Sequence, residues 1–138
     1  MDIKIRYEFP SNSEFNDLFS SVGWGDREED KVNIHRQKSD FAVSVYDNLR
    51  IVGMARVVGD GSYYTIYDVV VRKEYQSKGI GRILMEEVVA WYKTIEDDDT
   101  YLYLGASENR EGFYEKFGFK RRPYNHVGAG MKYDPISE

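Results

Sequence analysis

The sequence predicts one domain of the mixed α/β (α+β) class, with a central, mostly antiparallel sheet of six to seven strands and about four helices. Two patterns predict this class. Residues 41–71 have the pattern of three consecutive strands joined by short turns, and residues 79–104 that of a helix followed by a strand. A meander is antiparallel, whereas a strand that returns after a helix is parallel to its predecessor. We therefore expect a mixed sheet, and the length of 138 residues predicts a single domain over 1–138.

The N-terminal part predicts one strand and two helices. Apolar and polar residues alternate over 3–9, which indicates a half-buried strand that a proline ends. A serine cap, at Ser11 or Ser13, precedes apolar residues at helical spacing and predicts a helix over 11–22. A Gly-Trp-Gly turn separates this helix from a highly charged second one over 26–38.

The centre of the chain changes to a period of two residues. Phe41–Tyr46 and Arg50–Val58 flank an Asp-Asn turn, which is typical of a β-hairpin. A second turn, Gly-Asp-Gly, leads into Tyr63–Val71, where β-branched and aromatic residues are frequent. These segments predict an antiparallel meander of three strands.

The remaining elements begin after a polar loop, Arg72–Lys78. Apolar residues on one stripe predict a long helix over 79–93. The other expected elements are a strand at 101–104, a short helix at 109–116 with Gly118 as its breaker, and two final strands at 119–121 and 130–133.

Composition excludes several classes of function. The net charge of −5 argues against a nucleic-acid partner bound by bulk charge neutralisation. Without cysteine, disulfides and cysteine-ligated metal sites are excluded, and two isolated histidines predict no metal site. The start lacks the apolar run of a signal peptide, and no apolar stretch is long enough to span a membrane. We therefore expect a cytoplasmic protein with no membrane partner.

The charge is distributed unevenly along the chain. Residues 72–82 hold four Lys/Arg against one Glu, a balance of +3. Residues 1–30 hold three against eight Asp/Glu, or −5, and residues 83–119 three against nine, or −6. The basic segment coincides with the glycine-bearing turn at Gly79 and Gly81 before the long helix. A helix N-terminus there exposes unpaired amides, so the segment is a candidate site for a phosphate or pyrophosphate.

Two well-known glycine-rich phosphate loops do not match this turn. The Walker pattern requires Lys-Ser/Thr after the second glycine, and Gly81 has no such pair behind it. The dinucleotide fingerprint requires a third glycine where Leu84 stands. A helix start without any ligand is the structural alternative.

Two motifs together carry a resemblance to a known family. Gln-x-x-Gly-x-Gly at 76–81 follows Val-Val-Val and precedes Ile-Leu-Met, and Phe-Tyr-Glu-Lys-Phe-Gly-Phe stands at 113–119. The sequence resembles the GNAT superfamily of acetyl-CoA-dependent N-acetyltransferases, and looks closest to small bacterial acetyltransferases of small amines. The resemblance covers nearly the whole chain, since the order of elements also matches the family's fold.

The resemblance implies a direct transfer of acetyl from acetyl-CoA, the cosubstrate, to a primary amine, with no metal. It implies that Tyr114 donates a proton to the departing thiolate and that Asn109 is a candidate contact to the pantetheine arm. Val69, Val70 and Val71 would pair with that arm, and Gln76, Ser77, Lys78, Gly79, Ile80, Gly81 and Arg82 would form the cofactor loop around the pyrophosphate.

The base and the acceptor site are less well marked. Asp68 is the best-placed carboxylate, either as base or substrate anchor or as a structural hydrogen-bond acceptor. Trp24 and Tyr64 are candidate walls of the acceptor pocket, with a packing role as the alternative, and His35 and His126 are expected at the surface. The acidic regions favour a small, cationic amine as acceptor. A protein acetyltransferase, acting on an N-terminus or a lysine, and a non-catalytic CoA-binding module are the alternatives. A homodimer is possible.

Overall fold

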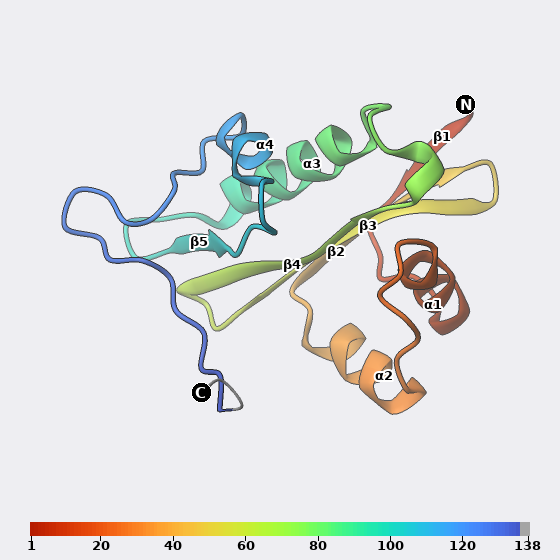
Figure 1. The fold of residues 1–138 in the computed structure, drawn as a ribbon, viewed down its shortest axis with the longest axis horizontal. Coiled ribbons are helices and arrows are strands. Elements are labelled where there is room, and N and C mark those ends of the chain that lie inside the picture. The colour runs from red at the N-terminus through yellow and green to blue at the C-terminus, as the bar shows by residue number, and fades with distance from the viewer. Residues whose placement is uncertain (136–138) are drawn as a thin grey trace. The chain divides into compact units, whose positions relative to one another are not determined.

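A five-stranded sheet forms the centre of the fold in the computed structural model, which describes residues 1–135 (Figure 1). The strands lie side by side in chain order, β1 to β4 antiparallel and β5 parallel to β4. They are β1 (Ile3–Arg6), β2 (Phe41–Asp47), β3 (Arg50–Gly59), β4 (Tyr63–Val71) and β5 (Tyr101–Leu104). The prediction of a mixed, mostly antiparallel sheet is therefore confirmed.

The predicted number of six to seven strands is wrong. Neither 119–121 nor 130–133 forms a strand in the described part of the chain; the only pairing there is an isolated bridge between Tyr124 and Val127. A short alternation of residues becomes a strand only when a partner strand lies beside it, and the sequence does not contain that information. The first strand is also shorter than predicted, ending at Arg6.

Residues 1–135 contain four α-helices, the number that the sequence predicts. They are α1 (Asn12–Ser21), α2 (Glu29–Lys38), α3 (Ile80–Ile95) and α4 (Glu111–Glu115), with a turn of 3-10 helix at Lys73–Tyr75. Ser11 caps α1 in a capping box: its Oγ accepts from the amide of Glu14 at 3.2 Å, and its own amide donates to Oε1 of Glu14 at 3.0 Å.

The chain divides into two compact units. The first, Met1–Leu104, contains the whole sheet and α1 to α3. The second begins at Gly105 and contains α4.

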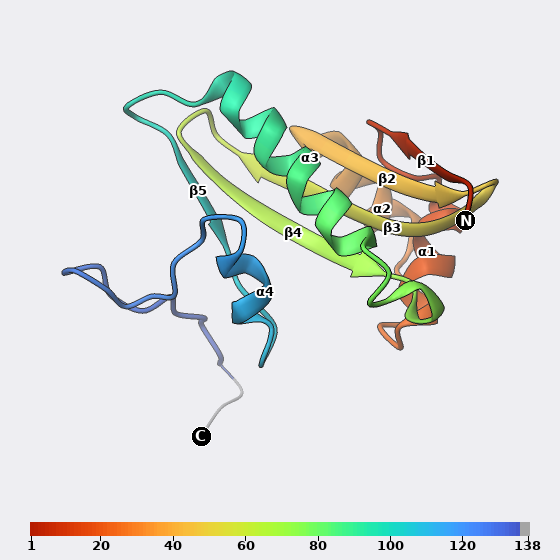
Figure 2. The same cartoon turned by 90° about the horizontal axis from the view of Figure 1, so that it is seen from above.

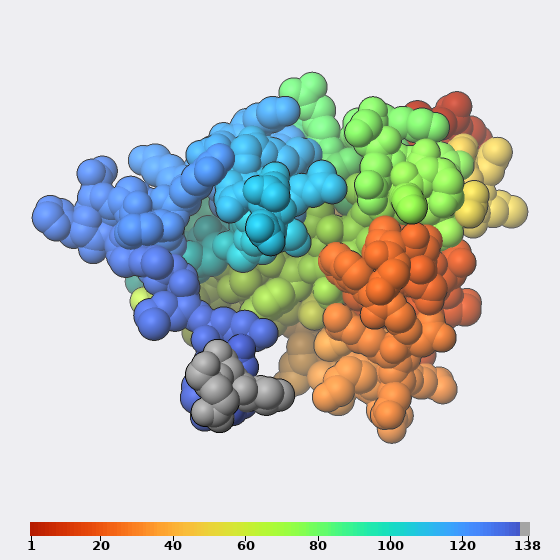
Figure 3. All heavy atoms as spheres, in the orientation of Figure 1, coloured from red at the N-terminus to blue at the C-terminus, as the bar shows by residue number. Residues whose placement is uncertain are grey.

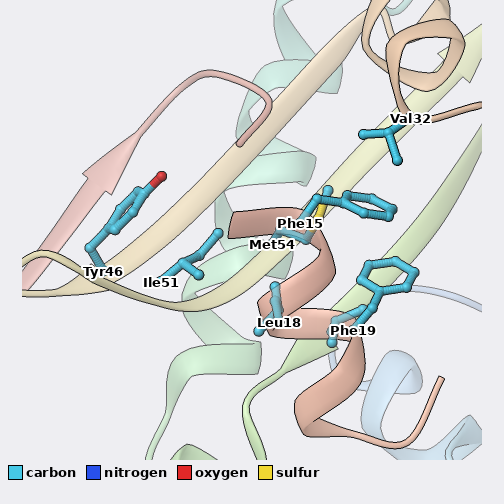
Figure 4. Close-up of a cluster of buried hydrophobic side chains, with 8 residues drawn as sticks. Phe15, Leu18, Phe19, Val32, Tyr46, Ile51 and Met54 are labelled. Atoms are coloured by element: carbon cyan, nitrogen blue, oxygen red, sulfur yellow. The ribbon is translucent and has the colours of Figure 1, made fainter. Parts of the chain in front are cut away.

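In the first unit, helices cover both faces of the sheet. Figures 1 and 2 show α3 along one face and α1 and α2 on the other. Neighbouring residues of β3 identify the two faces: a Cβ on Gly53 would meet Ile80 of α3, whereas Met54 belongs to the buried cluster on the side of α1. That cluster, drawn in Figure 4, combines Phe15, Leu18, Phe19, Val32, Tyr46, Ile51, Met54 and Val70.

Candidate functional site

The second half of β4 has an unpaired edge. β4 pairs with β5 only from Tyr63 to Ile66, but it continues to Val71. No described strand pairs with residues 67–71 on the side away from β3. The predicted pantetheine segment, Val69–Val71, lies on this edge, which offers peptide groups to an extended ligand.

A β-bulge interrupts β4 just beyond its last contact with β5. Arg56 of β3 lies opposite Tyr67, and Met54 lies opposite Val70, so Asp68 and Val69 together face one residue of β3. Asp68 has a positive φ of 56°. The extra residue changes which face the side chains reach: Tyr64 packs on Trp91 of α3, whereas Val70 joins the cluster on the side of α1.

The loop after β4 leads into an uncapped helix. Ser77 (φ 63°) and Gly79 (φ 87°) take left-handed conformations, and Gly79 is the N-cap of α3. No side chain within residues 1–135 caps this helix, and its first turn has no acidic residue. The first intrahelical bond runs from the amide of Ile83 to the carbonyl of Gly79 at 3.1 Å. The amides of 80–82 precede that bond and form the positive end of the helix dipole.

Three of the four cations of the basic segment are exposed around this helix start. Lys73, Lys78 and Arg82 face solvent; Nζ of Lys78 lies 5.5 Å above the ring of Tyr75, and Arg82 lies 3.9 Å from Glu86. Figure 3 shows the loop, in green, on the outer surface beside the orange residues of the α1–α2 region.

The fourth cation, Arg72, is buried, although the sequence predicts it as part of a polar loop. Its Nε donates to the carbonyl of Ile51 at 2.9 Å, and its Nη2 donates to Asp17 of α1. It therefore contributes to packing and not to the charge around the helix start. Gln76 also has a structural partner, because its side-chain Nε2 donates to the carbonyl of Val71 at 3.0 Å and ties the loop to the end of β4.

Asp68, the candidate base, forms an ion pair. Nε of Arg56 donates to its Oδ2 at 2.6 Å, and the two side chains are 9% and 10% exposed. This contact favours the structural alternative for Asp68 over the role of base. Arg56 is a residue that sequence reasoning missed, because a strand arginine is ordinarily exposed and nothing in the sequence signals its partner.

His35 is half-buried, contrary to the expected surface position. Its Nε2 lies 2.9 Å from Nη1 of Arg27, and Ser39, bonded to the carbonyl of His35, also accepts from Arg56. Burial first, and then the positive charges of Arg56 and Arg27, lower the pKa of His35. A cluster of polar side chains, formed by Arg27, His35, Ser39 and Arg56, thus lies beneath the bulge on the α2 side of the sheet.

The two candidate acceptor residues lie in different surroundings. Trp24 is 53% exposed and packs edge-on against Phe19 at 5.2 Å. Tyr64 is buried in the core against Trp91 and Tyr92 of α3, which supports the packing alternative for this residue.

The second unit holds the other predicted site residues. Tyr114 lies on α4, half-buried, with its ring 5.1 Å from Phe113 and 6.5 Å from Phe119. Burial raises its pKa, and Arg110 opposes that rise. Asn109 precedes α4 with a φ of 67°. Gly118 ends the turn after α4 with a φ of 94°, as its predicted breaker role requires.

Comparison with known proteins identifies the family. Residues 19–136 match the family described as "Acetyltransferase (GNAT) domain". The chain belongs to the GNAT acetyltransferase family. An uncharacterized N-acetyltransferase (ycf52) from Porphyra purpurea is 31% identical to this GNAT domain over 115 residues, which are 80% of this chain and 65% of that protein. Serotonin N-acetyltransferase 2 of rice (Oryza sativa subsp. japonica), a chloroplast protein, is 32% identical over 114 residues, 78% of this chain and 56% of its own length.

Solved structures agree with the family assignment. A probable acetyltransferase of unknown function from meticillin-resistant Staphylococcus aureus superposes with a TM-score of 0.84 at 28% identity, covering 96% of this chain and 98% of that one. The chain spans less than two thirds of the length of the Porphyra and rice relatives, and the rice protein is chloroplastic. The cytoplasmic location and the small-amine subtype therefore both remain predictions.

Two classes of feature are missing from residues 1–135. No helix there is both long and apolar enough to cross a membrane. No three His, Asp or Glu side chains are grouped there in a way that could hold a metal ion.

Proposed function

We propose that this GNAT domain transfers the acetyl group of acetyl-CoA to the primary amine of a small-molecule acceptor by direct attack. One observation carries the proposal. The uncapped N-terminus of α3 follows directly on a strand, β4, whose second half has an unpaired edge. The two features would bind different parts of one ligand, an anionic head and an extended amide arm.

The residues present fit acetyl-CoA. The amides of 80–82 would hold the pyrophosphate, with Lys78 and Arg82 adding positive charge nearby. The left-handed conformation of Gly79 turns the chain into the helix without a side chain at the approach. The edge of Val69–Val71 would bind the pantetheine amides as a strand binds its neighbour.

A row of tyrosines supports a cationic or aromatic amine as the acceptor. Tyr63 and Tyr101 stack with ring centres 5.2 Å apart, and Tyr103 lies 6.4 Å from each. These rings and Tyr67 are partly exposed on the same face of β4 and β5, where an ammonium group could lie over them. The name of the rice relative, a serotonin N-acetyltransferase, also supports this class of acceptor.

The reaction requires two proton movements. The acceptor ammonium loses a proton before its nitrogen attacks the thioester carbon; a C–N bond then forms, the C–S bond breaks, and the thiolate takes a proton. Tyr114 is our candidate donor, because it stands in the 113–119 motif that carries the family resemblance and its phenol is protonated at neutral pH. Since Asp68 already accepts from Arg56, we assign the first proton to water.

A panel assay tests this function. Thiol release from acetyl-CoA is measured with aromatic amines, polyamines, amino sugars, and peptides carrying a free N-terminus or a lysine. We expect turnover with a small amine, and Gly81→Glu should weaken CoA binding at least tenfold in calorimetry. Turnover confined to peptides would indicate a protein acetyltransferase, and CoA binding without any turnover a regulatory module.

A further inference from the structure

We infer that Arg56 and Asp68 are positioning residues: their ion pair holds the bulge of β4 in the shape that leaves the edge at 67–71 open. This inference rests on the proposed function, because that edge is where the acyl donor would bind. The pair would act through the backbone of β4 and without touching the reacting atoms.

The backbone conformation of Asp68 is unfavourable unless other contacts stabilise it. A residue with a side chain rarely adopts a positive φ inside a strand, because its Cβ crowds the neighbouring carbonyl. Asp68 does so at φ 56°, between two stretches of β4 that pair regularly with β3. Such a conformation persists only where tertiary contacts stabilise it by more than its local steric cost.

Arg56, on the neighbouring strand β3, holds the carboxylate of Asp68 in place. Its guanidinium is fixed on three sides: it donates to Asp68 at 2.6 Å, it donates to Ser39 at 3.4 Å, and it lies 5.3 Å from the ring centre of Tyr67. Both charges are nearly buried, so the contact is little screened by solvent. The carboxylate of Asp68 is therefore held at one place, and the backbone that carries it is held with it.

The bulge has a consequence for the neighbouring strand. Pairing between β4 and β5 stops at Ile66 and Leu104, two residues before Asp68. A bulge bends its strand and increases the local twist, which turns the following residues out of register with a straight neighbour. Without the extra residue, β4 would keep one alternation from Tyr64 to Val70, whereas these two side chains lie on opposite faces.

Two substitutions at Asp68 separate the ion pair from the backbone preference. Asp68→Gly accepts a positive φ freely but cannot bind Arg56, and Asp68→Asn accepts it and keeps an oxygen for Arg56. Asn48→Gly is the matched control, because Asn48 has nearly the same φ, 54°, in the exposed turn between β2 and β3. For each variant we would measure the Kd of CoA by calorimetry, the thermal midpoint, and hydrogen exchange of the amides of 69–71.

The expected result is a graded loss in the two Asp68 variants and none in the control. Asp68→Gly should bind CoA at least tenfold more weakly and lose exchange protection at 69–71. Asp68→Asn should show a smaller loss in the same direction, because it keeps an oxygen for Arg56 but not the charge, and Asn48→Gly should stay within threefold of the unmodified protein. In steady state, the KM for acetyl-CoA should rise more than the KM for the amine. If Asp68→Gly does not fold, Arg56→Gln, which keeps one donor, should show the same pattern in milder form.

Two other outcomes have distinct meanings. Tight CoA binding by Asp68→Gly, with protection at 69–71 intact, would overturn the inference and leave the proposed function standing. Failure of the unmodified protein to bind CoA would overturn the proposed function, and the inference with it.

Discussion

Nη2 of Arg72 lies 2.5 Å from Oδ2 of Asp17, which joins the end of β4 to α1 across fifty-five residues of sequence. Arg72 is 3% exposed, whereas the side chain of Asp17 is 61% exposed, so the arginine is the buried partner. The contact shows that the basic segment around the helix start includes one cation that is part of the core.

Replacing Arg72 with methionine should therefore affect stability more than binding. Two hydrogen bonds of a buried charge are lost, and the carbonyl of Ile51 loses its donor, so we expect the free energy of unfolding to fall by about 1–3 kcal/mol. Denaturant unfolding measures this change. The matched variant Lys78→Met should leave stability nearly unchanged and weaken CoA binding. A tenfold rise in the Kd of CoA in a well-folded Arg72→Met protein would contradict this division of roles.

Gly53→Ala should displace the N-terminus of α3. A Cβ at this position would stand 2.8 Å from Cγ2 of Ile80 and 3.3 Å from the carbonyl of Val70, and neither atom belongs to the far end of a flexible chain. We expect a loss of about 1–3 kcal/mol in the free energy of unfolding, since overpacking a core has a cost of that order. CoA binding should weaken as well, because the helix start moves. Gly130→Ala is the control, with nothing within 4 Å of its added Cβ; equal stability of the two variants would refute the prediction.

Tyr46 should make stability depend on pH in the alkaline range. Burial first, and then the negative charge and hydrogen bond of Glu14, raise the pKa of Tyr46 to about 12. The folded-state pKa lies above the unfolded value of about 10. The protonated phenol of Tyr46 therefore makes its full contribution to the free energy of unfolding below pH 10, and this contribution is lost as the pH rises towards 12. Unfolding by urea between pH 9 and 12 should show stability falling less steeply in Tyr46→Phe. Parallel curves for the two proteins would mean that Tyr46 does not keep its proton in the folded state.

Tyr114→Phe should lower kcat by about 10- to 100-fold, because the departing thiolate loses its proton donor. Burial raises the pKa of Tyr114, so the phenol ionises at a higher pH than that of a free tyrosine, and its ionisation does not lower the rate near neutral pH. The two proteins should therefore have pH profiles of the same shape and different height in this range. Tyr133→Phe, at an exposed position in the same unit, serves as the control. An unchanged kcat in Tyr114→Phe would remove this residue from the mechanism.

Local patterns predicted the elements that frame the site. The alternation of 41–71 and the apolar stripe from Ile80 are each present within a continuous run of residues, and the structure has β2 to β4 and α3 close to the predicted bounds. The turn at Gly79 is also a local feature, since its left-handed conformation depends on the residue type. The two final strands failed because strand formation depends on a partner that a short sequence pattern does not specify.

By itself, the sequence determined the mixed fold, the glycine turn before α3 and the family to which the chain belongs. Only the tertiary structure decided which charges are available to a ligand. It pairs Arg72 with Asp17 and Arg56 with Asp68, and it leaves Lys73, Lys78 and Arg82 exposed. The physical reason is that the role of a charge depends on its burial and its partner, and both are set by the packing of segments that are distant in the chain.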